Sequence, residues 1–401
     1  MNAQSHLDSG CDPMPAAMVP QRQQAPLHLA PGGAQTVPLA FEGGRWSAEA
    51  GVVLRKDIDA PRAFTRTLAA VLADPRDPRR SNFPLEARRK QRVCQMAAGS
   101  EDAHDAHTLR DDPLCTLRRD RLPDPGSSWA SPPPRSRFAN RVSRPALSRM
   151  ALALLRQWIA SSPSAPQVIV LDGDAPEDPV HGGQEPARSA SYDGGDCCMP
   201  RPVDEGRSGR LLPTMLHAKR LTGAQRRAVL KRLGKRLRQV WPHTLLLVRG
   251  ARHLASPAVR PWIAAPPSRG SGTGLTSTGV LQAWAREGVA QATRASALRG
   301  HKVTRCPSTR SQAGTWSRPR RVVIKVEGAE PGIHTRVGGT DLEQARTQVR
   351  SQQISCARGQ AENESKAHKL YLQSERTSWQ RCEATQWRVL WHAAAYVRRE
   401  T

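Results

Sequence analysis

The 401-residue chain has few of the side chains that normally fill a large core. Aromatic residues make up only 4% of it, and its 10 Trp outnumber its 4 Phe and 3 Tyr together. Aromatic side chains bury large areas and dominate core energetics, so their scarcity predicts a marginally stable fold. The length itself is sufficient for more than one domain.

The sequence also lacks the marks of secreted, membrane and zinc-binding proteins. Its 8 cysteines include no Cys-x-x-Cys pair, and the adjacent Cys197 and Cys198 cannot occupy two corners of a zinc site. No basic segment followed by an apolar one opens the chain, as a signal peptide requires. No apolar run approaches the roughly 20 residues that span a bilayer. We therefore expect a soluble, cytoplasmic protein with no membrane partner.

Acidic residues are scarce relative to basic ones. The chain has 35 Asp and Glu against 61 Lys and Arg, a formal net charge of +26. Basic surfaces gain affinity for polyanions by releasing condensed counterions, which favours a nucleic acid as partner. A membrane surface is the competing polyanion. Alternatively, the excess of arginine reflects GC-rich coding and indicates no binding partner. Charge alone leaves these interpretations open.

The pattern of apolar residues predicts an alternation of helices and strands. Helical spacing is found over 64–72, 147–158, 223–240 and, for a short helix, 280–289. Continuous apolar runs over 168–171 and 245–248 predict buried strands, and the segment 321–326 predicts another strand. The interval 182–209 is polar and Gly-rich and indicates neither. This alternation is typical of an α/β fold.

The predicted helix over 223–240 has a strongly basic face. Thr222 is its candidate N-cap, and Leu233, Leu237 and Val240 are among the residues expected to point inward. The opposite face carries Arg226, Arg227, Lys231, Arg232, Lys235, Arg236 and Arg238. Such a face is either a solvated surface or a contact to the DNA backbone.

Carboxylates stand where a nuclease needs them. Asp172 and Asp174 follow the first predicted strand, and Glu362 lies on a predicted helix far along the chain. Oxygen ligands of this kind suit hard divalent cations. Arg358 and Lys369 share one side of that helix with Glu362, where they can hold a phosphate. A turn or helix cap at the aspartates and a surface ladder of charges on the helix are the ordinary alternatives.

The carboxy-terminal part resembles bacterial insertion-sequence transposases of the Asp-Asp-Glu (DDE) class, the group with a Tyr-Arg-Glu-Lys signature. The resemblance rests on 358–363, Lys369 and 390–397, although Ser355 replaces the signature Tyr. Similar segments occur upstream in the family's order, at 74–78, 101–110, 170–175, 178–182 and 316–323. Together they cover most of residues 40–398.

The resemblance implies an α/β fold with an RNase H-like mixed sheet flanked by helices. It divides the chain into a disordered leader (1–35), a helical DNA-binding region (36–165), the first part of the catalytic core (166–260), an insertion with strands (261–350) and a helical end carrying Glu362 (351–401). It also implies two-metal chemistry with Mg²⁺ or Mn²⁺. The expected partners are the terminal inverted repeats, target DNA and a second copy in a homodimer, which would place the protein at the nucleoid.

The same resemblance assigns the site. Asp174 is the first catalytic acid, because Asp174-Ala175-Pro176 fits the family's Asp-small-Thr context better than Asp172, which is the second choice. Glu362 is the last catalytic acid. Asp174 and Glu362 are the implied metal ligands, and the implied nucleic-acid-binding residues are Arg358, Lys369 and Arg249.

The second catalytic acid is missing. The chain reads Arg249-Gly250-Ala251-Arg252-His253 where the family has Arg-Gly-Asp-Ser-His, and no Asp or Glu occurs from Arg207 through Arg286. Alanine has no oxygen to give a metal, so we expect impaired catalysis in a degenerate copy. A non-catalytic DNA-binding relic and a chain that folds poorly are the alternatives, and the glycines of 336–340 weaken an expected strand.

Overall fold

The structure is a computed structural model, and all structural statements refer to the residues it describes. These are 27–28, 38–39, 63–72, 77–80, 83–100, 109, 112, 142–173, 178–179, 188–189, 196–208, 210–217, 222–250, 252–264, 269–275, 277–314, 316, 318–329, 332–340, 363, 366–367, 369–372 and 381–399.

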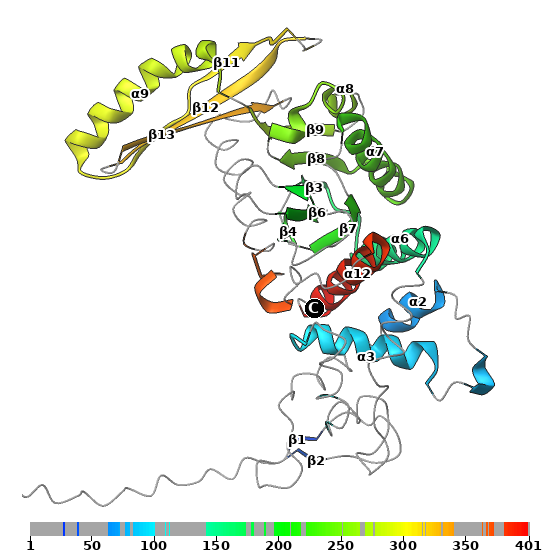
Figure 1. The fold of residues 1–401 in the computed structure, drawn as a ribbon. Coiled ribbons are helices and arrows are strands. Elements are labelled where there is room, and N and C mark those ends of the chain that lie inside the picture. The colour runs from blue at the N-terminus through cyan, green and yellow to red at the C-terminus, as the bar shows by residue number, and fades with distance from the viewer. Residues whose placement is uncertain are drawn as a thin grey trace, which may run out of the picture.

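A single mixed sheet organises the molecule (Figure 1). Its central strands are β3 (Val168–Gly173), β6 (Asp196–Glu205), β7 (Arg210–His217), β8 (Leu245–Gly250) and β9 (Arg269–Gly274). They lie in the order β7-β6-β3-β8-β9. β8 runs parallel to β3 and β9, whereas β6 is antiparallel to β3 and β7. This arrangement confirms the predicted mixed sheet, and the predicted strands 168–171 and 245–248 are β3 and β8.

Helices α6 (Arg144–Ala160), α7 (Gly223–Val240) and α8 (Arg260–Ala264) pack on this sheet. Their apolar residues share one buried cluster with Ile169 and Leu171 of β3 and Leu246 and Val248 of β8. Ile169 is paired with Leu246 and Leu171 with Val248. Alternation along each strand therefore turns Asp172 and Arg249, the residues that follow Leu171 and Val248, to the other face.

Helix α7 begins as the sequence predicts. The Thr222 hydroxyl accepts a hydrogen bond from the Gln225 N–H at 3.2 Å, and the Gln225 side chain accepts one from the Thr222 N–H at 2.9 Å, a capping box. The expectation for Val240 is wrong: it is 48% exposed. The helix ends there, and the next residue, Trp241, fills the core instead, edge-on to Trp158 with ring centroids 5.6 Å apart.

Strands β6 and β7 are not predicted by the sequence. They occupy part of the polar interval and the residues after it. Pro200 and Pro202 lie inside β6, and a proline normally argues against an inner strand because it cannot donate to the ladder. The pairing of β6 with β7 also shifts register between Arg201 and Val203, which breaks the alternation that would have indicated a strand.

Residues 279–340, part of the region expected to be an insertion, continue the sheet. They form α9 (Gly279–Arg299), β10 (Val303–Arg305), β11 (Ser308–Ser311), β12 (Arg320–Ala329) and β13 (Gly332–Thr340). α9 packs on β12, and β13 pairs with both β12 and β9. β13 forms despite its glycines, and a Cβ at Gly339 would lie 3.2 Å from Leu275. α9 is longer than the predicted helix over 280–289. It ends only at Gly300, whose left-handed backbone (φ +64°) caps the helix.

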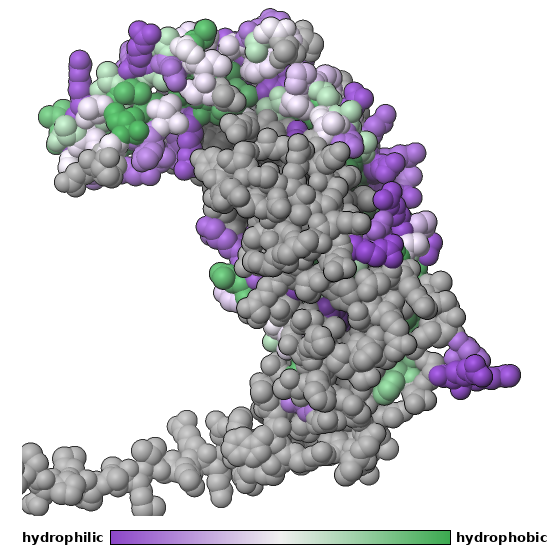
Figure 2. All heavy atoms as spheres, viewed as in Figure 1, coloured by the Kyte–Doolittle hydropathy of each residue, from purple (hydrophilic) through white to green (hydrophobic). Residues whose placement is uncertain are grey.

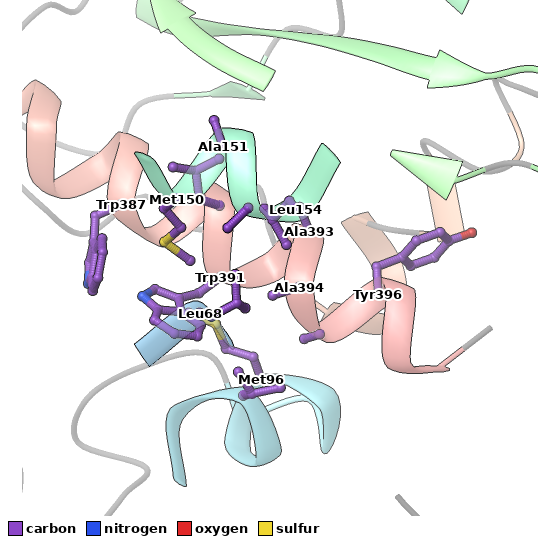
Figure 3. Close-up of a cluster of buried hydrophobic side chains, with 14 of the residues drawn as sticks. Leu68, Met96, Met150, Ala151, Leu154, Trp387, Trp391, Ala393, Ala394 and Tyr396 are labelled. Carbon is purple, nitrogen blue, oxygen red and sulfur yellow. The ribbon is translucent and has the colours of Figure 1, made fainter. Parts of the chain in front are cut away.

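A second core joins the amino-terminal helices to the end of the chain (Figure 3). α2 (Phe64–Ala70) and α3 (Leu85–Ala97) pack with α6 and α12 (Cys382–Arg399). Trp391 of α12 is fully buried and lies edge-on to Trp387, with centroids 5.2 Å apart. The Arg89 guanidinium lies 4.7 Å from the centre of the Trp387 ring. Tryptophan thus supplies the volume that the rare Phe and Tyr do not.

The remaining described elements are short: β1 (Leu27–His28), β2 (Pro38–Leu39), η1 (Pro78–Arg80), β4 (Asp178–Pro179), β5 (Arg188–Ser189) and η3 (Arg252–Ala255). Of the helices in the described part of the chain, none is both long and apolar enough to cross a membrane.

Replacing Trp391 with alanine should destabilise the protein by about 3–5 kcal/mol, because it empties a fully buried site. Urea unfolding followed by Trp fluorescence and circular dichroism measures the change. Trp284→Ala is the matched control: this side chain of α9 is 42% exposed, so its loss should cost within about 0.5 kcal/mol. Equal losses would contradict the packing described.

Glu327 should make a pH-dependent contribution to stability. Hydrogen bonds from Lys302 (2.6 Å) and then Lys325 (2.8 Å) lower the pKa of Glu327 from 4.5 to about 2. A depressed carboxyl pKa stabilises the fold above the unfolded pKa, and this stabilisation is lost as pH falls from 4.5 toward 2. Glu327→Gln should therefore cost up to about 1 kcal/mol at neutral pH and less in acid. A pH-independent difference in urea unfolding would contradict this.

Candidate functional site

The ends of β3 and β8 define the candidate site. The two strands are parallel and in register from Val168 opposite Leu245 to Gly173 opposite Gly250. The next residues in the chain are Asp174 and Ala251, so both follow directly from paired positions at one edge of the sheet. Asp174 and Ala251 themselves lie outside the described residues.

A buried ion pair joins the two strands one residue before this edge. Asp172 and Arg249 are 2% and 3% exposed and stand opposite each other. Arg249 Nε donates to Asp172 Oδ1 at 2.6 Å, and Arg249 Nη2 donates to Asp172 Oδ2. Both carboxylate oxygens are thus engaged by one guanidinium, a geometry with high directional specificity. Asp172 is therefore poorly placed to serve as a metal ligand, which favours Asp174.

The turn between β6 and β7 closes over this pair. Gly206 donates its N–H to the Val170 carbonyl at 2.8 Å, and its own carbonyl lies 3.5 Å from Arg249 Nη2. A side chain at Gly206 would collide with both Asp172 and Arg249. Glu205 accepts hydrogen bonds from the N–H groups of Val170 at 3.3 Å and Ser208 at 2.8 Å. The end of β6 and the turn that follows it thus enclose the pair between Asp172 and Arg249.

Sequence reasoning missed Glu205 and Gly206. The available signal was Gly206 with Ser208 two residues later, a composition typical of a tight turn. Without β6 and β7 on either side, that step was indistinguishable from the rest of a Gly-rich interval.

Two glycines allow the strand ends to approach closely. A Cβ on Gly173 would lie 2.7 Å from Leu254 Cδ1, and a Cβ on Gly250 would lie 2.7 Å from the Gly173 carbonyl oxygen. Leu254 belongs to η3, the short helix that follows β8, and is itself buried. Any larger residue at either position would push β3, β8 or η3 apart.

The other predicted site residues are only partly described. Arg358 and Glu362 lie outside the described residues. Lys369 is half-buried, and all described residues of 363–372 are helical. Leu372, three residues later, is fully buried in the cluster around Trp391. Arg249, assigned to nucleic-acid binding by the resemblance, is held by Asp172, and its role with DNA stays a prediction.

The surroundings of the strand edge are rich in positive charge. No acidic residue occurs from Arg207 through Arg286, a stretch that supplies β7, α7, β8, η3 and α8. Within the described part of the chain, His, Cys, Asp and Glu side chains form no group of three or more suited to a metal. The implied metal ligands Asp174 and Glu362 fall outside that part. The segment from Arg207 through Arg286 is therefore basic, as a segment that binds a polyanion would be.

Comparison with known proteins gives a family match over most of the chain. The family described as transposase DDE domain, group 1, matches residues 29–400. Among solved structures, the chain is similar to a piggyBac transposase in a synaptic complex with hairpin DNA, determined by cryo-EM. That similarity has a TM-score of 0.43 and 11% identity over 87% of this chain and 73% of the other. No curated protein matches the sequence.

Removing one member of the buried pair should be more costly than removing both. Arg249→Met leaves the Asp172 carboxylate buried and uncompensated, which should cost about 3–5 kcal/mol of unfolding free energy. Asp172→Leu combined with Arg249→Met should recover much of that loss. Urea unfolding of the single and double variants gives the coupling energy.

The control for this cycle is Lys235→Met, which removes an exposed charge of α7 and should change stability within about 0.5 kcal/mol. If Arg249→Met were as mild as this control, the pair would not hold β3 to β8.

Proposed function

We propose that this chain, which belongs to the transposase DDE domain group 1 family, is an insertion-sequence transposase with impaired DNA cleavage. The observation that carries the proposal is the in-register parallel pairing of β3 with β8 up to Gly173 and Gly250. Asp174 and Ala251 each come directly after one of these paired glycines in the chain. A catalytic site built from two strand ends requires its acids at such positions.

The donor set fits a hard divalent cation only in part. Asp174 and Glu362 offer the carboxylate oxygens that Mg²⁺ or Mn²⁺ prefers, whereas Ala251 offers none. When bound, such ions supply activation of the attacking hydroxyl and stabilisation of the leaving oxygen in phosphodiester cleavage.

The protein's own residues divide the remaining work. The Asp172–Arg249 pair fixes the strand ends, and in our proposal Arg358 and Lys369 hold the phosphate beside Glu362. Ala251 removes a negative charge from the site, and Arg252 adds a positive one beside it. Loss of one preorganised group of this kind commonly lowers the rate about 10²- to 10³-fold.

Binding without cutting is the second candidate function. It is favoured by the absence of acidic residues from Arg207 through Arg286. That absence removes the expected catalytic acid, and it keeps the segment basic, as DNA binding requires. Such a relic would still occupy the element's terminal inverted repeats, as a homodimer if it joins two ends. A preference for these repeats over scrambled DNA near physiological salt would distinguish recognition from general basicity.

Restoring the acid should restore cleavage. We expect Ala251→Asp to raise Mg²⁺- or Mn²⁺-dependent nicking of labelled element-end DNA by about 100-fold or more over the unmodified chain. Adding Glu362→Ala to that variant should return nicking to the background. Ala251→Asn is the matched control, because it has the size of Asp without the charge.

Each outcome of this assay bears on a different claim. Fast nicking by the unmodified chain would contradict the impairment. Binding of element ends without nicking by any variant would favour the relic over the transposase. If the chain bound no DNA, the proposal would be wrong.

A further inference from the structure

Helix α7 carries a stripe of exposed basic side chains along its outer face. We call it the α7 stripe: Arg227, Lys231, Arg232, Lys235 and Arg236, all of which are exposed. The helix contains no acidic residue. In Figure 2 hydrophilic side chains gather along the edge of the molecule where Figure 1 shows α7. The stripe is thus a continuous basic surface.

The packing of α7 fixes the direction of the stripe. Leu230, Leu233 and Leu237 are buried in the cluster beneath the helix, so the stripe cannot turn toward the sheet. Arg227 and Lys235 lie two i+4 steps apart on one side of the helix, a distance of about 12 Å along its axis. That is enough to meet several successive phosphates, which recur every 3.4 Å or so of helix axis along each DNA strand.

Nothing in the described part of the chain neutralises the stripe. None of its members forms an ion pair there, and Arg236 donates only to the Gln239 side chain at 3.2 Å. Other cations of the structure do have acidic partners: Lys90 is 3.0 Å from Glu86 and Arg144 is 3.1 Å from Glu383. A like-charged row lacking such partners is repulsive by itself, and binding of a polyanion relieves that repulsion.

The stripe begins beside the candidate site. α7 precedes β8 and runs antiparallel to it, so the first turn of α7 lies near the end of β8. A Cβ on Gly223 would lie 2.9 Å from both Ser256 and Ala258, which follow η3 after β8. Arg227 is one turn beyond Gly223. DNA held at the strand edge can therefore continue along α7.

We infer that the α7 stripe binds the phosphate backbone of duplex DNA, independently of base sequence, on one side of the candidate site. The inference rests on the proposed function for its DNA partner. Flexible cations on an exposed helix face position a duplex through phosphates and carry no sequence information themselves. The stripe should thus contribute equally to element-end and unrelated DNA.

The test compares salt dependence between matched variants of the full chain. The stripe variant is Arg227→Gln, Lys231→Gln and Lys235→Gln. The control removes the same charge from exposed positions of α9, through Arg286→Gln, Arg294→Gln and Arg299→Gln. Glutamine is a good helix former, so both helices should persist, and circular dichroism checks this.

We expect the stripe variant to reduce the slope of log affinity against log salt by about 2 to 3, since each lost phosphate contact removes about 0.9. The reduction should be the same for an element-end duplex and a scrambled duplex. The α9 variant should change the slope by less than about 1. Lys231→Arg with Lys235→Arg should retain the slope, because it keeps the charge. If the stripe variant unfolds, Lys231→Gln alone should still lower the slope by about 0.9.

Three results would overturn the inference. The slope of the stripe variant could equal that of the unmodified chain or of the α9 control, which would place the DNA elsewhere. The reduction could be confined to the element-end duplex, which would make the stripe a reader of ends. If the unmodified chain bound neither duplex, the proposed function would fail as well, whereas the first two results leave it standing.

Discussion

The buried pair between Asp172 and Arg249 is the interaction on which the rest of the site depends. It joins two parallel strands at opposed positions, inside the sheet and one residue before the strands end. Parallel pairing comes from segments far apart in sequence, so its register needs a specific anchor. A buried ion pair requires both partners to be in place, because either charge left alone in the interior lowers the stability of the fold. A shift of β8 along β3 would separate the two charges, so the observed register is far more favourable than a neighbouring one.

In the proposed function, the catalytic acid expected at position 251 has been lost while the pairing of β3 with β8 persists. Ala251 follows the paired positions in the sequence, whereas the pair itself is formed by Asp172 and Arg249. Replacing a site carboxylate removes chemistry without creating a cavity or a buried charge. Arg249, by contrast, cannot change without exposing Asp172 to an apolar interior. Selection for folding alone would thus preserve Arg249 and tolerate Ala251.

The sequence predicts local features well and long-range partners poorly. The helix capped by Thr222 and the runs that become β3 and β8 follow from nearest-neighbour patterns. The pairing of Asp172 with Arg249 spans 77 residues and has no local signal. β6 was missed because its prolines contradict the usual composition of an inner strand. The resemblance assigned Arg249 to DNA binding, and no local pattern indicated its carboxylate partner inside the sheet.

The most direct test of the central claim is a crystal structure of the Ala251→Asp variant soaked with Mn²⁺, in which anomalous scattering locates the ion. The account predicts a peak at the edge where β3 and β8 end, in contact with the carboxylates of Asp174, Glu362 and the new side chain at 251, with the Asp172–Arg249 pair unchanged. A peak bound by Asp172 in place of Asp174, or an ion away from these strand ends, would contradict it.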